Sequence, residues 1–199
     1  MERDFSKLEQ IQRLVLDIIK VERNHYIYET DRHENVVEHS FSLAMLCWRI
    51  FDIVQPSLDL TKIFKYALIH DFSERGQGKD TNTYATREER EMKKEREHKE
   101  LNKFFSEFKD FSNFTNTLKE YEVKGDGESL FVWSIDKIQA KILGQIDNWR
   151  PYAEYGITYE EYCKKSDEFF AKCSPYLKDI FMEVCEVTKK TYYDRPKNP

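Results

Sequence analysis

The sequence predicts an all-α protein, a helical bundle of roughly seven or eight helices. Apolar residues recur at three- and four-residue steps along most of the chain, which is the spacing of one helix face. Neither an alternating apolar–polar strand pattern nor an internal repeat is found. A chain of 199 residues can bury one sizeable core but hardly two, so residues 1–199 are expected to form a single domain with a core over about 5–190.

The first two expected helices differ in how much of their surface is apolar. The pattern breaks over residues 24–32, between the two helices. The second helix should begin at Asn35, because Glu38 three residues later completes a capping box. Its sequence is apolar nearly all round as far as Phe51, so it should be central and buried. The first helix has one apolar face, formed by Phe5, Leu8, Ile11, Val15, Ile18 and Ile19.

The third expected helix leads to an adjacent histidine and aspartate. Asp59 can cap its start, and its apolar face over residues 60–68 ends at His70-Asp71. Residues 76–80 follow and read Gly-Gln-Gly-Lys-Asp, which predicts a turn. Loops in such positions often carry ligand contacts.

A charged helix and a long apolar helix are expected next. Residues 87–103 interleave acidic with basic side chains, which favours a solvated helix over a surface for nucleic acid. A turn is expected at 124–127. The apolar helix that follows carries Asp136.

Two further helices are expected towards the C-terminus. Thr158 with Glu161 predicts a capping box at the start of the first. Ser174-Pro175 predicts a cap with proline at the first helical position of the second. The last residues, Tyr192–Pro199, are expected to form a frayed tail.

Charge and composition argue against several classes of protein. The chain has 32 basic and 37 acidic residues and a net charge of -5, which argues against a protein that wraps duplex nucleic acid. No apolar stretch reaches the length of a transmembrane helix, and the first residues lack a basic region followed by an apolar one. We therefore expect no membrane span and a cytoplasmic protein. The cysteines show no CxxC spacing and are expected to be free thiols: Cys47, Cys163, Cys173 and Cys185.

Two histidines and two aspartates are the candidate metal ligands. His39, His70, Asp71 and Asp136 each lie on or beside a segment expected to be helical. Two imidazoles and two carboxylates suit Mn²⁺, Fe²⁺, Co²⁺, Ni²⁺ or Zn²⁺ better than Ca²⁺, which prefers oxygen ligands alone. Such an ion can polarise a phosphoryl group and activate water, so hydrolysis of a phosphate ester is the expected reaction class.

Two acidic residues close to the His-Asp pair are candidate functional groups. Glu74 comes four residues after His70 and would lie on the same side if the helix continued for one more turn. Its carboxylate could handle a proton of water or of the leaving oxygen, whereas the alternative is a surface glutamate. Asp80 is either a turn residue or a contact to a ligand hydroxyl.

Three segments together resemble a known family. Residues 32–40 read Arg-His-Glu-Asn-Val-Val-Glu-His-Ser, residues 70–74 read His-Asp-Phe-Ser-Glu, and residues 136–140 read Asp-Lys-Ile-Gln-Ala. This pattern resembles the HD-domain metal-dependent phosphohydrolases, and within them the bacterial 5′-deoxynucleotidase branch. The resemblance covers residues 5 to about 190. It implies an all-α fold, a homodimer, and removal of phosphate from deoxyribonucleoside 5′-monophosphates with one divalent transition metal.

The resemblance also implies roles for individual residues. It makes Glu74 the catalytic carboxylate and places Asp80 near the sugar of the nucleotide. The family's glycine–aspartate pair is changed here, since Lys79 separates the glycine from Asp80. The branch has an Arg-Trp pair that contacts the nucleotide. Counting back from His39 without gaps places Asn24-His25 at these two positions, and Arg23 lies one position before them. The implied metal ligands are His39, His70, Asp71 and Asp136, and the substrate-binding candidates are Arg23, Asn24, His25, Lys79 and Asp80.

Two alternatives remain open from the sequence. A related HD-domain group releases triphosphate from deoxynucleoside triphosphates, for which Arg75, Lys79, Arg87 or Arg90 could neutralise the additional phosphates. The other alternative is a nucleotide-binding protein without catalytic activity.

Overall fold

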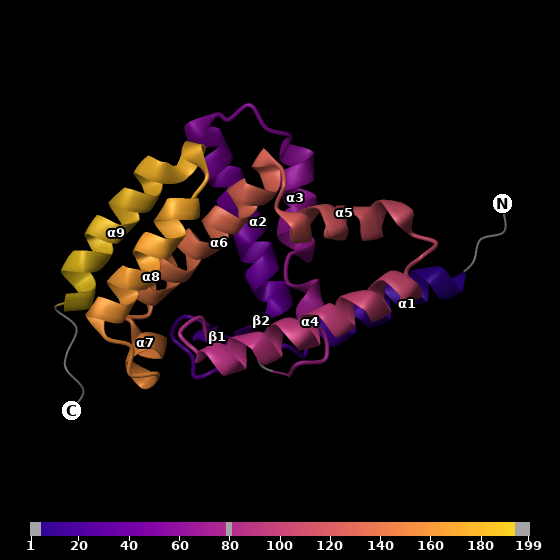
Figure 1. Cartoon of the computed structure of the whole chain (residues 1–199), viewed down its shortest axis with the longest axis horizontal. Helices are drawn as coiled ribbons and strands as arrows, with labels where there is room; N and C mark the ends of the chain where they lie inside the picture. Colours follow the sequence, from indigo (N-terminus) through magenta and orange to yellow (C-terminus); the bar gives the residue numbers. More distant parts are fainter. Residues whose placement is uncertain (1–4, 79–80, 194–199) are drawn as a thin grey trace.

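The computed structural model describes residues 5–78 and 81–193 and shows an all-α protein, as predicted (Figure 1). The described residues form nine α-helices, slightly more than expected, and none of these helices is long and apolar enough to cross a membrane. Two 3₁₀ turns, η1 (Phe72–Glu74) and η2 (Pro175–Leu177), and two strands, β1 (Glu22–Tyr26) and β2 (His33–Asn35), complete the described elements. The helices are α1 (Phe5–Ile18), α2 (Val36–Val54), α3 (Leu60–Ile69), α4 (Arg87–Glu107), α5 (Ser112–Val123), α6 (Gly127–Ile146), α7 (Arg150–Glu154), α8 (Tyr159–Lys172) and α9 (Lys178–Tyr193).

The main core lies where α2, α3 and α6 pack together, with α9 on the other side of α6. Leu43, Ile63 and Ile135 represent the three central helices in this core, and each is fully buried. A second group of buried side chains joins α1 to α4, which runs alongside it in Figure 1, and includes Leu14 and Phe104. The predicted central position of α2 is confirmed by these contacts, but the prediction that the helix is buried is wrong on one face, where Phe41, Met45 and Trp48 are exposed.

Local capping signals set the starts of several helices as predicted. Asn35 Oδ1 accepts hydrogen bonds from the backbone N–H groups of Val37 and Glu38 at 3.0 Å, and Glu38 Oε2 accepts one from the Asn35 backbone N–H. Asp59 caps α3 in the same way. The box of Thr158 and Glu161 is also present, at the start of α8. Side chains within one turn of the helix satisfy its unpaired N–H groups in each case.

The antiparallel hairpin β1–β2 was not predicted from the sequence. Glu22 pairs with Asn35 and Tyr26 with His33, with an irregular register between the two pairs. Most strand residues are polar, and β1 is partly exposed along its length, so no apolar alternation marks it in the sequence. The hairpin packs β1 against α6 and α7 and so brings residues 23–25 to the centre of the molecule.

The segment that carries Glu74 also differs from the prediction. α3 ends at Ile69, His70 is its C-cap, and the chain continues through Asp71 into the 3₁₀ turn η1. Glu74 is therefore not on an extension of α3, although it is buried close to the end of that helix. The tighter turn changes the direction in which the side chain projects.

The C-terminal helices form a third group of buried side chains, rich in aromatic rings. Trp149 is fully buried, and its ring packs edge-on against Tyr152, Tyr162 and Tyr192. Tyr192 is only 2% exposed, so the expected frayed tail does not begin at this residue, and residues 194–199 lie outside the described range. Packing of the ring, with a hydrogen bond from its hydroxyl to the Ile157 carbonyl, outweighs the tendency of a chain end to fray.

Ser174 does not cap the last helix as predicted. Its side chain makes no capping hydrogen bond, and Pro175 begins η2, so that α9 starts only at Lys178. The Ser174 backbone N–H instead donates to Ser134 Oγ on α6 at 2.9 Å. A second contact ties α6 to α8, because the buried Lys141 ammonium donates to Tyr162 and Ser166 at 2.8 and 2.6 Å.

We predict that replacing Gly144 by alanine destabilises the fold by roughly 1–3 kcal/mol through overpacking. An added Cβ would lie 2.8 Å from Trp149 Cζ3 and 2.9 Å from Tyr152 Cε2, and the Trp149 ring has no exposed side towards which it can move. This cost should exceed the gain of about 1 kcal/mol that alanine brings over glycine in a helix. Chemical denaturation of Gly144→Ala and the parent measures the difference.

Gly125→Ala is the matched control, because its added Cβ would meet only Val123 Cγ1, at 3.3 Å, on an exposed turn. Its free energy of unfolding should stay within about 0.5 kcal/mol of the parent. Equal stability of Gly144→Ala and the parent would show that the aromatic group adapts to the additional methyl.

Candidate metal centre

The four candidate metal ligands meet at the crossing of α2, α3 and α6. His39 comes from α2, His70 and Asp71 from the end of α3, and Asp136 from α6. His39 Nε2 lies 3.2 Å from Asp136 Oδ1 and 3.9 Å from Asp71 Oδ2, and His70 Nε2 lies 3.0 Å from Asp71 Oδ2. His39, His70 and Asp136 together form a group compact enough to hold one ion. Elements far apart in sequence thus place two nitrogens and two carboxylates around one point.

Both histidine rings are oriented by a partner on the side away from this point. His70 Nδ1 lies 2.9 Å from the Ala67 carbonyl, to which it donates, so in the neutral ring Nε2 is the nitrogen that can bind a metal. His39 Nδ1 lies 3.4 Å from Glu34 Oε1 at the end of the hairpin. Metal-binding histidines commonly have such outer partners, which fix the ring and its tautomer.

The donor set fits a divalent transition metal. His39 Nε2 and His70 Nε2 are buried and make no hydrogen bond of good geometry with the described residues, although carboxylate oxygens lie 3.0–3.9 Å away. Nitrogens that converge on carboxylates without bonding to them are what a shared ion requires. The set does not distinguish Mn²⁺, Fe²⁺, Co²⁺, Ni²⁺ and Zn²⁺ from one another.

The charges around the centre keep both aspartates ionised. Burial alone would raise the pKa of Asp71, but the His70 ring and the Arg23 guanidinium outweigh it and lower that pKa. For Asp136 the effect of burial is outweighed by Lys137 and His39, and its pKa also lies well below the ordinary value. Both carboxylates are thus in the form that binds cations.

Arg23 is the basic residue that closes one side of the centre. It forms an ion pair with Asp71, and its Nη2 lies 3.9 Å from Asp136 Oδ1. Its Nε lies 3.4 Å from Glu34 Oε1. A role for Glu34 was not predicted from the sequence, although this residue lies inside the segment on which the resemblance rests.

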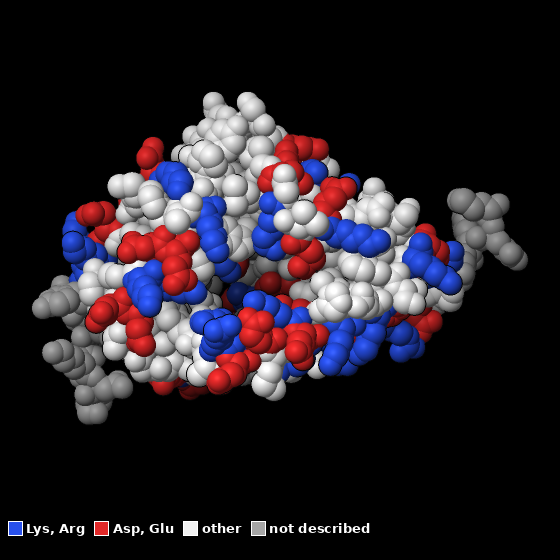
Figure 2. Space-filling model, in the orientation of Figure 1, with Lys and Arg blue, Asp and Glu red and all other residues white. Residues whose placement is uncertain are grey.

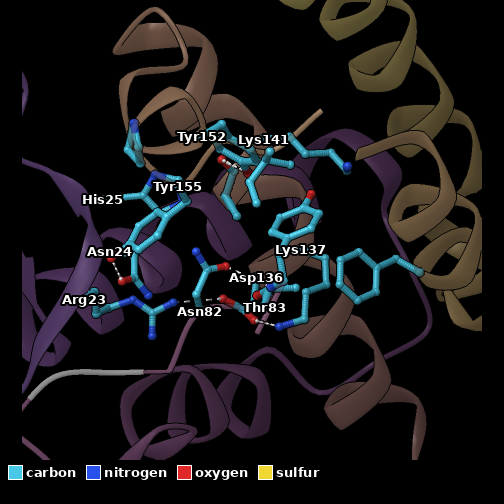
Figure 3. A pocket seen from close by; sticks show the side chains of 15 residues that line it. Arg23, Asn24, His25, Asn82, Thr83, Asp136, Lys137, Lys141, Tyr152 and Tyr155 are labelled. Atoms are coloured by element: carbon cyan, nitrogen blue, oxygen red, sulfur yellow. Dashed lines mark hydrogen bonds and ion pairs between the residues drawn. The ribbon is translucent and has the colours of Figure 1, made fainter. Parts of the chain in front are cut away.

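A pocket opens beside the centre and contains three of the substrate-binding candidates (Figure 3). One end is charged and is lined by Arg23, Asp136 and Lys137, whose ammonium lies 2.6 Å from Asp136 Oδ2. The remaining wall is uncharged apart from Lys141 and includes Asn24, His25, Asn82, Thr83, Tyr84, Tyr152, Tyr155 and Ile157.

Within this pocket the polar side chains are held in place or kept neutral. Asn24 Oδ1 accepts a hydrogen bond from the Tyr155 hydroxyl at 2.6 Å. Burial lowers the pKa of His25 to about 4, so this imidazole is neutral near pH 7. The other two candidates, Lys79 and Asp80, lie outside the described residues.

Figure 2 shows a hollow in the middle of one face, between α4 and α6, with acidic side chains in its depth and basic ones around it. Glu74 is buried, with Oε1 2.6 Å from Lys93 Nζ on α4. Neither Lys93 nor Lys137 was singled out from the sequence. Lys137 follows Asp136 directly, which is the one local signal for it, and nothing near Lys93 in the sequence marks its contact with Glu74.

Comparison with solved structures finds the same fold in proteins of low sequence identity. A predicted metal-dependent phosphohydrolase from Magnetospirillum magnetotacticum MS-1 aligns with a TM-score of 0.76 and 19% identity over 96% of this chain and 97% of its own. The PH0347 protein from Pyrococcus horikoshii OT3 has a TM-score of 0.60 and 20% identity over 90% of this chain and 99% of its own. A conserved hypothetical protein from Pyrococcus furiosus has a TM-score of 0.58 and 22% identity over 90% of this chain and 99% of its own.

Comparison with curated protein sequences finds no match. The family profile described as HD domain, in contrast, matches residues 18–178. This range contains the hairpin, the crossing of α2, α3 and α6, and all four residues of the centre. By this match the chain belongs to the HD-domain family.

Proposed function

We propose that this protein is a metal-dependent phosphohydrolase that acts on deoxyribonucleoside 5′-monophosphates and releases phosphate and nucleoside. The observation that carries the proposal is a buried set of two imidazoles and two carboxylates that adjoins a pocket with one cationic end. The structural similarity to a protein described as a predicted metal-dependent phosphohydrolase supports it.

A divalent metal held by His39, His70, Asp71 and Asp136 would supply a Lewis acid for the phosphoryl group. The protein's own residues provide the remaining functions. Arg23 and Lys137 line the charged end of the pocket, where a guanidinium and an ammonium can bind phosphate oxygens. Glu74 is the candidate to take a proton from water or to give one to the leaving sugar oxygen.

The uncharged part of the pocket suits a nucleoside. Tyr84, Tyr152 and Ile157 offer ring faces and an apolar edge against which a base can pack. Asn24 and Asn82 offer amide groups that both donate and accept hydrogen bonds. A charged head with an aromatic, hydrogen-bonding body is the chemistry of a nucleotide.

The monophosphate is favoured because two of the cations considered for a triphosphate are engaged elsewhere. Arg75 is paired with Glu100 and Glu107 on α4 at 2.6 and 2.8 Å. Arg90 donates to the Ala85 carbonyl at 2.8 Å. Of the other two, Arg87 is exposed at the start of α4, and Lys79 lies outside the described residues.

Asp71→Ala should remove both bound metal and hydrolytic activity, because it deletes one ligand and leaves Arg23 without its closest carboxylate. The measurement is metal content per chain by elemental analysis, after purification without chelators. Asp52→Ala, at an exposed position on the same helix as His39, is the control and should keep the parental metal content. Parental metal content in Asp71→Ala would place the site elsewhere.

The parent protein should release inorganic phosphate from deoxyribonucleoside monophosphates, and Glu74→Gln should lower the turnover by about 10²–10⁴-fold while retaining bound metal. The amide keeps the shape of the side chain but cannot accept a proton. Phosphate release by the parent from a panel of nucleotides tests the substrate. The turnover number and the metal content of Glu74→Gln test the role of this residue.

Three outcomes of that assay would count against parts of the proposal. Release of intact triphosphate from deoxynucleoside triphosphates, without activity on monophosphates, would exclude the proposed substrate. Turnover of Glu74→Gln within a few-fold of the parent would exclude an acid–base role for this residue. Inactivity of the metal-loaded parent on every nucleotide would favour a binding protein.

We propose further that the protein is a homodimer in the cytoplasm. Phe41, Met45 and Trp48 recur at four- and three-residue steps on α2 and are 66%, 49% and 48% exposed, and Leu68 of α3 is also exposed. An apolar stripe on a central helix is typical of an interface, and a two-fold axis would pair it with itself. The four cysteines are free thiols, which suits a reducing compartment.

Light scattering during size exclusion should therefore give twice the mass of one chain. Phe41→Glu with Trp48→Glu should give a single-chain mass, because buried unpaired carboxylates oppose association. Lys94→Glu, on the exposed surface of α4, is the control. A parent that has the mass of one chain at micromolar concentration would refute the dimer.

A further inference from the structure

The short turn η1, which carries Glu74, is held by charged side chains of α4. Lys93 Nζ lies 2.6 Å from Glu74 Oε1. Arg75, which follows Glu74, is paired with Glu100 at 2.6 Å and with Glu107 at 2.8 Å. Three ion pairs thus connect one helix to Glu74 and to the residue that follows it.

The partners on α4 lie on one face of that helix. Lys93, Glu97 and Glu100 recur at four- and three-residue steps, and Lys93 Nζ also lies 3.4 Å from Glu97 Oε1. Phe104, near the other end, is the buried residue of α4. Lys93 therefore contacts η1 by charge, whereas the aromatic contact of α4 with this turn, that of Phe104 with Phe72, lies near the other end of the helix.

The pair of Lys93 and Glu74 is well shielded from water. The two side chains are 21% and 4% exposed. A carboxylate that has lost most of its hydration depends on a nearby cation to stay ionised and ordered. An ammonium in contact with Oε1 also restricts rotation of the carboxylate about its terminal bond.

We propose that Lys93 is the positioning residue for the Glu74 carboxylate, an inference that rests on the proposed function. Lys93 holds Oε1 and so keeps the carboxylate in one orientation relative to Asp71, whose carbonyl accepts the Glu74 backbone N–H at 3.0 Å. Lys93 acts through Glu74 and does not itself bind the phosphate of the substrate.

Three variants test this role. Lys93→Met removes the charge with little change of length, and Lys93→Arg keeps the charge. Lys94→Met is the matched control, because Lys94 is the next residue, is 68% exposed and pairs with Glu91 one turn earlier on the same helix. A misplaced catalytic group should lower kcat by about 100-fold in Lys93→Met, with KM little changed. Lys93→Arg should recover about tenfold of this loss, and Lys94→Met should behave as the parent.

The same substitution in a Glu74→Gln background separates positioning from phosphate binding. If Lys93 acts through Glu74, Lys93→Met adds no further loss to Glu74→Gln, because residues that act as a unit are not additive. Multiplied losses, or a raised KM with an unchanged kcat, would overturn the inference in favour of a phosphate contact.

The assay uses whichever ester the parent hydrolyses among deoxynucleoside mono- and triphosphates and p-nitrophenyl phosphate. If the parent hydrolyses another of these esters but no monophosphate, the proposed substrate is contradicted. The Lys93 variants can then still be compared on the ester that is hydrolysed. The free energies of unfolding of the parent, Lys93→Met, Glu74→Gln and the double variant give a coupling that needs no substrate. Zero coupling would also overturn the inference.

Discussion

The burial of two carboxylates and two imidazoles at the crossing of α2, α3 and α6 is the constraint on which the rest of the molecule depends. Ionised groups in a protein interior are costly unless each has a partner. Arg23 and Lys137 supply the positive charge, and Glu34 and the Ala67 carbonyl orient the rings. The hairpin is needed for this reason, because it carries both Arg23 and Glu34 to the centre.

Helix α6 connects this centre to the rest of the fold. It brings Asp136 to the ligands, Ser134 to the backbone of Ser174, and Lys141 to the hydroxyls of α8. Near its end Gly144 leaves room for the Trp149 ring, which packs against a residue of the pocket wall, Tyr152. One helix therefore links the charged core, the C-terminal aromatic group and the wall of the pocket.

The features that the sequence predicted well are those governed by neighbours along the chain. Capping by Asn35, Asp59 and Thr158 depends on side chains within one turn, and helix faces depend on spacing alone. The three motif segments also contain the four candidate ligands that lie close together in the structure, namely His39, His70, Asp71 and Asp136.

The features that the sequence did not reveal depend on contacts between distant segments. The strands are short and polar, and they are held by each other and by α6 and α7. The prediction for Glu74 assumed that α3 continues, whereas the chain turns into η1 after Asp71. Lys93 contacts Glu74 from another helix, and Tyr192 is retained by three rings from two other segments of the chain, so neither contact is visible in local patterns.

The buried contact between α6 and α8 affects how the protein responds to alkali. Burial lowers the pKa of Lys141 to about 8 from an ordinary value of 10.5. Between these two values the unfolded chain holds a proton that the folded chain has released, so this residue makes the native state more stable as the pH rises. Below about pH 8 the ammonium is buried at a cost, and it donates hydrogen bonds to the hydroxyls of Tyr162 and Ser166. The cost of this buried charge to the native state is therefore fully present below about pH 8 and disappears as the pH rises towards 10.5.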